Sequence, residues 1–199
     1  NRGISMRFGF FFWPYAPDYT VRMARLGEEL GFHLVWIADT PGNAMDPWVA
    51  LTLVASHTTR VGIPMCVTNV VTRHPAITAT AAASVDLVSG GRAILGIGAG
   101  HSGVVNIGQV TASPGRLREA VSFIRVLLSG QRISDGAATM QIPWVRHRVP
   151  VYVAASGPNA LGVAGAVADG AFVNYGLQAE LIAQAEDLIR SGAKEAGRD

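Results

Sequence analysis

The sequence predicts an α/β fold with a parallel sheet, and two observations support this fold class. Apolar, strand-like segments alternate with helix-like segments along the chain, which is typical of parallel strands joined by helices. Hydrophobic residues make up 49% of the chain and charged residues only 15%, which suits strands that are buried on both faces. The 199 residues are enough for one well-buried domain, which we expect to span residues 1–199.

Six short apolar runs are predicted to be strands, and each is followed by a predicted helix. The strands are expected over residues 7–12, 34–38, 60–67, 93–97, 151–154 and 171–174. The helices are expected over residues 18–30, 46–57, 75–89, 116–128, 158–167 and 179–191. Residues 130–149 mix polar and aromatic side chains and are expected to form an excursion such as a small hairpin.

The helix ends carry recognisable local signals. The first helix is expected to turn Val21, Ala24, Leu26 and Leu30 inward and to end at Gly31. The second has an aspartate N-cap followed by proline, Asp46-Pro47, which is a strong start signal. Prolines also open the third and fifth helices, at positions 75 and 158.

Both an open doubly wound sheet and a closed (β/α)8 barrel fit this alternation. A barrel needs eight strand–helix units and about 250 residues, and this chain has two units fewer. Met6 would serve as a natural start. We therefore expect a fragment that ends after its sixth helix, at Asp199.

Composition excludes several classes of function. A formal net charge of +2 with scattered arginines gives no basis for binding nucleic acid. No apolar run reaches the roughly 18 residues of a membrane span, and residues 1–5 lack the apolar core of a signal peptide. The single cysteine, Cys66, excludes an internal disulfide and fits a reducing compartment. We expect a soluble cytoplasmic protein.

A glycine-rich stretch, Gly90 to Gly103, ends the fourth predicted strand and carries His101 and Ser102. Its segment 98–103 matches G-x-G-x-x-G, the dinucleotide-binding pattern, but no helix is predicted before Ser113, so a dinucleotide module is disfavoured. A histidine here could act as a general acid or contact a ligand. No partner at useful spacing indicates a catalytic triad or a metal site.

Polar residues follow the second and third predicted strands, where an α/β protein places its chemistry. Asp39 could accept a hydrogen bond from a ligand, act as a base, or cap a turn. The side chains of Thr68 and Asn69 would lie at the same carboxyl end of the strands as Asp39. Arg73 and His74 either bind a phosphate or carboxylate, or pair with an acid and cap the next helix.

The fifth strand ends in the small residues Ala154 to Gly157, and the helix begins at Pro158. The free N–H groups at such a helix start form a ready phosphate site, although an ordinary turn is an equal alternative. Cys66 is expected to be a buried small residue, because nothing near it in the sequence would activate the thiol.

Four blocks together resemble the bacterial luciferase-like family, and within it the deazaflavin-dependent reductases. They are Trp36 to Asp39; Val67 to Asn69 with Arg73-His74-Pro75; Ser89 to Arg92 through Gly100; and Ala154 to Pro158 with Ala168-Asp169-Gly170. The resemblance spans nearly the whole chain and implies a (β/α)8 TIM-type barrel, here truncated to about six units. It also implies an oxidoreductase that transfers hydride between reduced deazaflavin coenzyme F420 and a small organic substrate.

The resemblance carries site residues with it. It implies a non-proline cis peptide at Cys66-Val67 behind the ring system, and contacts of Asp39 and Thr68 with the ring. It implies phosphate binding by backbone groups of Gly157 and Pro158. The expected cofactor-binding residues are Asp39, Cys66, Val67, Thr68, Gly98, Gly100, Ser156, Gly157 and Pro158, and the expected catalytic residues are His101 and Asp39. Dimerisation is common in similar proteins, so a homodimer is also an expectation.

This chain departs from its apparent relatives at two positions. Many deazaflavin enzymes have an acidic proton donor at the position of His101, and many have histidine at that of Thr40. His101 is therefore our candidate proton donor or substrate contact. The alternatives are an FMN-dependent monooxygenase of the same fold and, from another class, a non-catalytic barrel fragment. The segment Thr72-Arg73-His74-Pro75 after Thr68-Asn69 favours the deazaflavin branch.

Overall fold

The computed structural model describes residues 6–136 and 138–198 and confirms the alternation of strands and helices. The strands that alternate with helices are β1 (Gly9–Phe11), β2 (Leu34–Trp36), β3 (Ile63–Asn69), β4 (Ala93–Gly98), β7 (Val151–Ala155) and β8 (Gly170–Val173). The long helices are α1 (Pro17–Glu29), α2 (Pro47–His57), α3 (Pro75–Ser89), α5 (Pro114–Leu128), α6 (Pro158–Val167) and α7 (Ala179–Glu195). The predicted bounds of α3 and α6 are confirmed to the residue.

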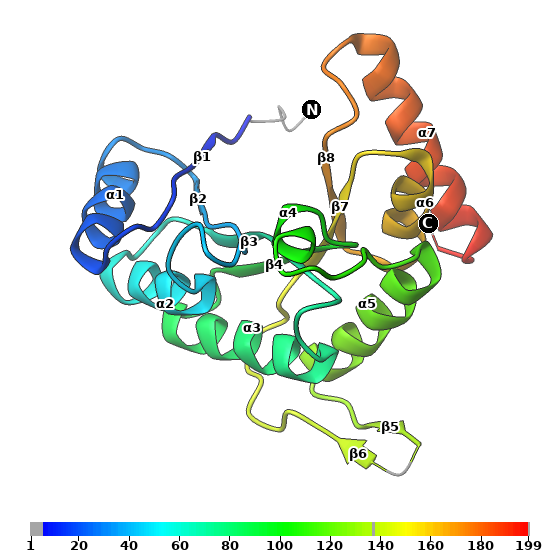
Figure 1. The fold of residues 1–199 in the computed structure, drawn as a ribbon, viewed down its shortest axis with the longest axis horizontal. Coiled ribbons are helices and arrows are strands. Elements are labelled where there is room, and N and C mark those ends of the chain that lie inside the picture. Colours follow the sequence, from blue (N-terminus) through cyan, green and yellow to red (C-terminus); the bar gives the residue numbers. More distant parts are fainter. Residues whose placement is uncertain (1–5, 137, 199) are drawn as a thin grey trace, which may run out of the picture.

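The strands form one curved parallel array in chain order. Strands β3, β4, β7 and β8 are hydrogen-bonded neighbours, and β1 pairs with β2. Single bridges from Leu34 to Gly62 and from Ile37 to Met65 connect β2 to β3. The long helices follow one another around the outside of the strands (Figure 1). This is the arrangement of a (β/α) barrel in which β1 and β8, among the described residues, each pair with one neighbour.

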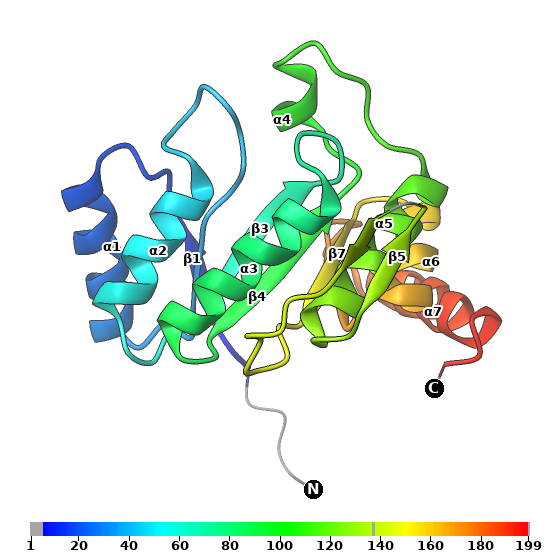
Figure 2. The ribbon, with the colours of Figure 1, turned by 90° about the horizontal axis from the view of Figure 1, so that it is seen from below.

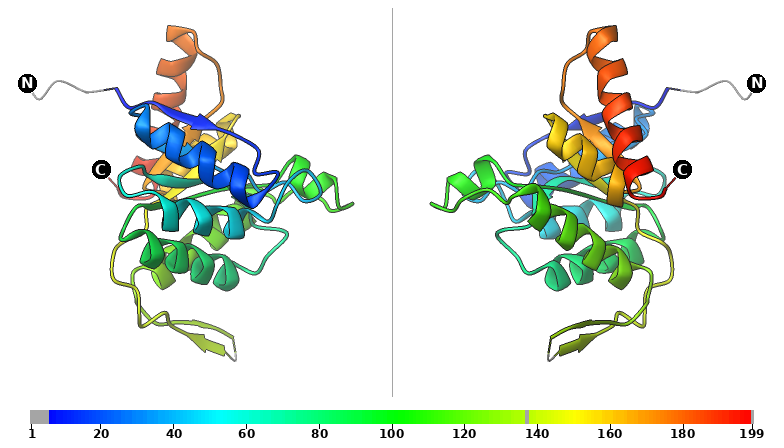
Figure 3. Two further views of the ribbon diagram at one scale, coloured as in Figure 1. Left: turned by 90° about the vertical axis from the view of Figure 1, so that its left-hand side faces the viewer. Right: turned by 90° about the vertical axis from the view of Figure 1, so that its right-hand side faces the viewer.

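The excursion before β7 is a hairpin, as predicted. Strand β5 (Ile133–Asp135) pairs with the antiparallel β6 (Ala138–Met140). The hairpin extends away from the strand–helix body (Figure 3). Among the helices in the described ranges, none combines the length and apolar character that crossing a bilayer requires.

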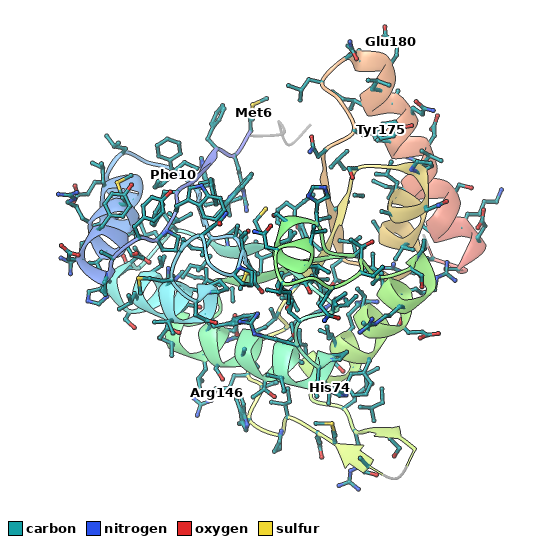
Figure 4. The ribbon with its side chains drawn as sticks, viewed as in Figure 1. Met6, Phe10, His74, Arg146, Tyr175 and Glu180 are labelled. Carbon is teal, nitrogen blue, oxygen red and sulfur yellow. The ribbon has the colours of Figure 1, made fainter. Side chains whose placement is uncertain are left out.

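The buried face of α1 differs from the prediction. Ala24 is buried as expected, but Leu26 and Leu30 are 42% and 67% exposed. The helix turns Thr20, Ala24 and Gly27 inward instead. A Cβ atom at Gly27 would collide with the ring of Phe10, which lies between β1 and α1 (Figure 4). Close approach of the helix to this ring selects small residues for its inner face, so the size of the aliphatic side chains misled the prediction.

The first half of the glycine-rich stretch is structural and lies at the opposite end of the strands from the loop that carries His101. Arg92, just before β4, donates hydrogen bonds to the carbonyl oxygens of Ala55, Thr58, Val61 and Ser89 and to the hydroxyl of Thr58. Burial lowers the pKa of Arg92, and the charge of Glu28 opposes this shift. One side chain thus joins the ends of α2 and α3 to the start of β3.

Glu28 makes a similar connection from α1 to the loop before β3. Its carboxylate accepts hydrogen bonds from the backbone N–H groups of Thr59, Arg60 and Val61 at 3.0, 2.6 and 3.0 Å. Burial alone would raise the pKa of Glu28, but these hydrogen bonds outweigh it and lower the pKa from 4.5 to about 2. The ionised carboxylate therefore stabilises the fold.

This shift predicts a pH-dependent contribution to stability. Because the pKa is lower in the folded state, the contribution is present above pH 4.5 and is lost as the pH falls toward 2. Glu28→Gln should lower the free energy of unfolding at pH 7 by about 1–2 kcal/mol, allowing for solvent screening at this partly exposed site. Urea unfolding measures the difference in free energy of unfolding between the unaltered protein and Glu28→Gln, and this difference should be smaller at pH 3 than at pH 7. The exposed neighbour Glu29→Gln is the control, and a difference independent of pH would contradict the assignment.

Candidate functional site

A cavity of about 720 Å³ lies at the carboxyl ends of the strands. This volume is typical of sites for a cofactor-sized ligand. It is lined by Trp36, Ala38, Asp39, Thr40, Cys66, Val67, Thr68, Asn69, Gly98, Ala99, Gly100, His101, Ser102, Gly103, Ala154, Ala155, Ser156, Ala160, Ala171, Phe172, Val173 and Asn174. Eight residues predicted for the site are therefore brought together here. Gly157 and Pro158 follow Ser156 directly but do not line the cavity.

Asp39 is held in a buried cluster at the end of β2. Its Oδ2 accepts a hydrogen bond from Thr68 Oγ1 at 2.6 Å and another from Arg73 Nη1 at 2.6 Å. Only 2% of the Asp39 side chain is exposed. This pairing confirms the alternative in which Arg73 pairs with a nearby acid, and it favours Asp39 as a hydrogen-bond acceptor rather than as a base.

Asn69 and His74 hold backbone groups rather than extend into the cavity as free polar groups. Asn69 Oδ1 accepts hydrogen bonds from the N–H groups of Val71 and Thr72, both at 2.9 Å. His74 Nδ1 accepts from the N–H of Ala76 at 3.2 Å and caps α3. The imidazole of His74 lies at the start of α3, outside the strands (Figure 4). The helix-capping alternative predicted for His74 is therefore confirmed.

The segment behind the cavity has the backbone that the resemblance implies. The Cys66-Val67 peptide is cis, and the pairing register of β3 with β4 shifts between Met65 and Thr68. Burial raises the pKa of the Cys66 thiol to about 11. Cys66 is therefore a neutral thiol near pH 7, and it lines the cavity without being a nucleophile.

Two glycines of β4 have different surroundings. A Cβ atom at Gly96 would collide with the carbonyl oxygen of Met65 and with the ring of Phe172. A Cβ atom at Gly98 would lie 3.4 Å from the Cβ of Ala154, an ordinary contact. Close packing therefore requires glycine at position 96, whereas the space at Gly98 opens toward the cavity and is free for a ligand.

His101 begins a short helix, α4 (Ser102–Val105), which the sequence analysis missed. It lies beyond the carboxyl ends of the strands (Figure 2). The carbonyl oxygen of His101 accepts the N–H groups of Val104 and Val105, and its exposed side chain forms no capping hydrogen bond. The prediction that no helix begins before Ser113 was therefore wrong. His101 nevertheless lines the cavity, and its side chain is exposed.

The start of α6 lies next to the cavity. Gly157 is the N-cap and provides no side-chain acceptor, and a Cβ atom there would meet nothing within 4 Å. The first-turn N–H groups of a helix have no acceptor within the helix, so they can receive an anion. Ser156 and Ala160 on either side line the cavity. This arrangement fits a phosphate-bearing group.

Two aromatic residues that were not predicted for the site, Trp36 and Phe172, also line the cavity. The ring of Trp36 lies 6.0 Å from that of Phe172, which lies 5.4 Å from the ring of Tyr152. Trp36 Nε1 is buried and has no hydrogen-bond partner among the described residues. The sequence signal that could have placed Phe172 in the site is its spacing from Asn174, because residues two apart in a strand lie on the same face.

The comparisons with known proteins agree with this geometry. The family model described as luciferase-like monooxygenase matches residues 6–199. The 5,10-methylenetetrahydromethanopterin reductase of Methanolobus tindarius is 35% identical, with 98% of this chain and 61% of that protein covered. The F420-dependent hydroxymycolic acid dehydrogenase of Mycobacterium tuberculosis is 33% identical, with 93% of this chain and 56% of that protein covered.

Among solved structures, the coenzyme F420-dependent tetrahydromethanopterin reductase of Methanopyrus kandleri has a TM-score of 0.81 and 29% identity. The match covers 98% of this chain and 63% of that one. The chain thus spans about three fifths of the length of the relatives that it matches. A family-model match over nearly every residue, together with relatives above 30% identity, leads to one conclusion. The chain belongs to the family of luciferase-like monooxygenases.

Proposed function

We propose that this chain carries the cofactor site of an oxidoreductase that transfers hydride between the deazaflavin coenzyme F420 and a small organic substrate. The observation that carries the proposal is the cavity of about 720 Å³, which places the Asp39 cluster, the open space at Gly98 and the uncapped start of α6 around one volume. The F420-dependent enzymes among the relatives support the choice of cofactor.

The residues present fit such a cofactor. The backbone from Cys66 to Thr68 and the space at Gly98 would hold the ring system, and the N–H groups at the start of α6 would hold the phosphate. When bound, the deazaflavin supplies the hydride acceptor or donor. Asp39 would orient the ring through a hydrogen bond, and His101 would supply or accept the proton that accompanies hydride transfer.

A fluorescence titration with coenzyme F420 and with FMN tests the proposal. Binding of only the deazaflavin supports it, and binding of only FMN supports an FMN-dependent monooxygenase instead. A folded chain that binds neither would overturn both and leave a non-catalytic barrel fragment. Secondary alcohols and methylenetetrahydromethanopterin, after the named activities of relatives, are the first substrates to test.

Gly98→Val should remove cofactor binding without unfolding the protein. The valine methyl groups would occupy the space at the cavity, so we expect the Kd for coenzyme F420 to rise at least about 100-fold, a loss of about 2.7 kcal/mol. Because Gly98 has ordinary contacts at its Cβ position, the melting temperature should stay within a few degrees. Gly96→Val is the matched comparison, and overpacking there should lower the free energy of unfolding by about 1–3 kcal/mol or more. An unchanged Kd for coenzyme F420 in Gly98→Val would show that Gly98 does not belong to the cofactor site.

We further propose that the protein forms a homodimer through the outer faces of α2 and α3. Neither helix exposes a Lys, Arg, Asp or Glu side chain. Four exposed hydroxyl groups on these helices each donate a hydrogen bond to a carbonyl oxygen of the same helix. They belong to Thr52, Ser56, Thr80 and Ser84. Such a surface loses few hydrogen bonds to water on burial, and an uncharged face meets a second copy of itself without like-charge repulsion.

A further inference from the structure

Arg73 connects two carboxylates that lie on a different loop from its own. It belongs to the segment between β3 and α3. Its Nη1 donates to Asp39 Oδ2 at 2.6 Å, and its Nη2 donates to Asp46 Oδ2 at 2.7 Å. The guanidinium side chain is 23% exposed, whereas the Asp39 side chain is 2% and the Asp46 side chain 47% exposed. The partly exposed side chain of Arg73 thus contacts both the buried Asp39 carboxylate and the exposed Asp46 carboxylate.

The two carboxylates mark the two ends of the loop between β2 and α2. Asp39 follows β2, and Asp46 is the N-cap of α2, where its Oδ1 accepts the N–H of Trp48 at 2.9 Å. Between them lie residues 40–45, of which Thr40 lines the cavity. One guanidinium therefore holds both ends of a cavity-lining loop, a task that suits its planar fork of donors and not the single ammonium of a lysine.

The same contact sets the direction of the Asp39 carboxylate. Oδ2 is occupied by Arg73 and by Thr68, which donates from the neighbouring strand at 2.6 Å. Oδ1 receives no hydrogen bond from any residue in the described parts of the chain, although Asp39 lines the cavity. With one oxygen anchored from two sides, the other is left as an acceptor for a ligand N–H or hydroxyl group.

We propose that Arg73 is a positioning residue of the cofactor site, which acts through Asp39 and not by touching the cofactor. It fixes the carboxylate so that Oδ1 accepts a hydrogen bond from the ring system, and it holds the loop 40–45 in place beside that ring. This role rests on the proposed function, because it assigns Asp39 to the bound deazaflavin. Arg73 would then determine affinity and ring orientation rather than the proton-transfer step.

The test is a double-mutant cycle read out as the Kd for coenzyme F420. Arg73→Gln and Asp39→Asn should each weaken binding about 10- to 100-fold. If Arg73 acts through Asp39, the Kd of the double variant for coenzyme F420 should be no higher than the larger of the two Kd values of the single variants. Additive losses would show that Arg73 contributes independently of Asp39 and would overturn the assignment.

Two milder variants keep the test decisive if Arg73→Gln does not fold. Arg73→Lys keeps the charge but cannot bridge both carboxylates, so binding should weaken by an intermediate factor. Asp46→Asn keeps an N-cap acceptor and leaves the contact between Arg73 and Asp39, so binding should weaken only a few-fold. Guanidinium ion added to Arg73→Ala at non-denaturing concentration should restore part of the affinity, and it should not restore that of Asp39→Asn.

Controls separate this role from general stabilisation and from failure of the proposed function. Arg125→Gln removes an arginine of similar exposure that pairs with Asp169 at the start of β8, and it should leave the Kd unchanged. If the unaltered chain binds no deazaflavin, the proposed function fails, and the Arg73 assignment fails with it. If the chain binds and Arg73→Gln lowers the melting temperature but not the affinity, only the Arg73 assignment is overturned.

Discussion

Replacing His101 with glutamine is expected to lower turnover by about 10²- to 10³-fold while the Kd for the deazaflavin changes little. The His101 side chain is exposed and has no capping hydrogen bond, so the substitution should remove the proposed proton donor without disturbing α4. The backbone carbonyl of His101, which accepts the N–H groups of Val104 and Val105, is retained in the variant. Turnover is measured as the change in deazaflavin fluorescence with the candidate substrates.

A second substitution at the same position makes this prediction sharper. His101→Glu restores a group that can transfer a proton, of the kind that many deazaflavin enzymes have there, so it should retain more activity than His101→Gln. His57→Gln, an exposed histidine at the end of α2, is the control and should not affect turnover. Unchanged kcat in His101→Gln, or a loss confined to the Kd, would contradict a role in proton transfer.

Replacing Arg92 with methionine is expected to lower the free energy of unfolding by about 3–5 kcal/mol. The guanidinium donates to four carbonyl oxygens and one hydroxyl, and methionine would leave these acceptors without their donors. A loss of this size is a large part of the stability of an ordinary domain, about 5–15 kcal/mol. Equilibrium unfolding in urea measures it, with a lower midpoint as the direct observable.

The matched control for Arg92 is a surface arginine. Arg148 contacts Asp169, but its side chain is 70% exposed, so Arg148→Met should cost about 1 kcal/mol or less. Equal losses for the two variants would mean that charge, and not the set of carbonyl contacts, explains the effect. The cavity lies at the other end of the strands, so a folded Arg92→Met sample should still bind the cofactor.

The elements that could be predicted are those with local signals. A proline at the first position of the helix marks where α2, α3 and α6 begin, and in α2 and α3 the residue before it also caps the helix, because these signals depend only on neighbours in sequence. Asp39, Thr68 and His101 could be placed because parallel strands bring their carboxyl ends to one edge, whereas Cys66 and Val67 were assigned to the site from the family resemblance. The cis peptide at Cys66-Val67 followed from the family resemblance and not from any local signal.

The features that could not be predicted depend on partners far away in sequence. The inner face of α1 is selected by the Phe10 ring, and Trp36 joins the site through its approach to Phe172. The short helix α4 has no strong start signal of its own. The choice between a ligand contact and an ion pair for Arg73 was open, because its partners lie 34 and 27 residues away.

The sequence by itself determined the α/β class, the order of strands and helices, and the edge at which the site would lie. Alternation, capping and hydrophobic pattern are local properties, and they suffice for those conclusions. Only the tertiary structure decided that Arg73 braces Asp39 and Asp46, that Arg92 is structural while His101 is free, and that Gly98 rather than Gly96 opens on the cavity. These outcomes depend on which atoms meet across the fold, and one sequence carries no direct record of such long-range contacts.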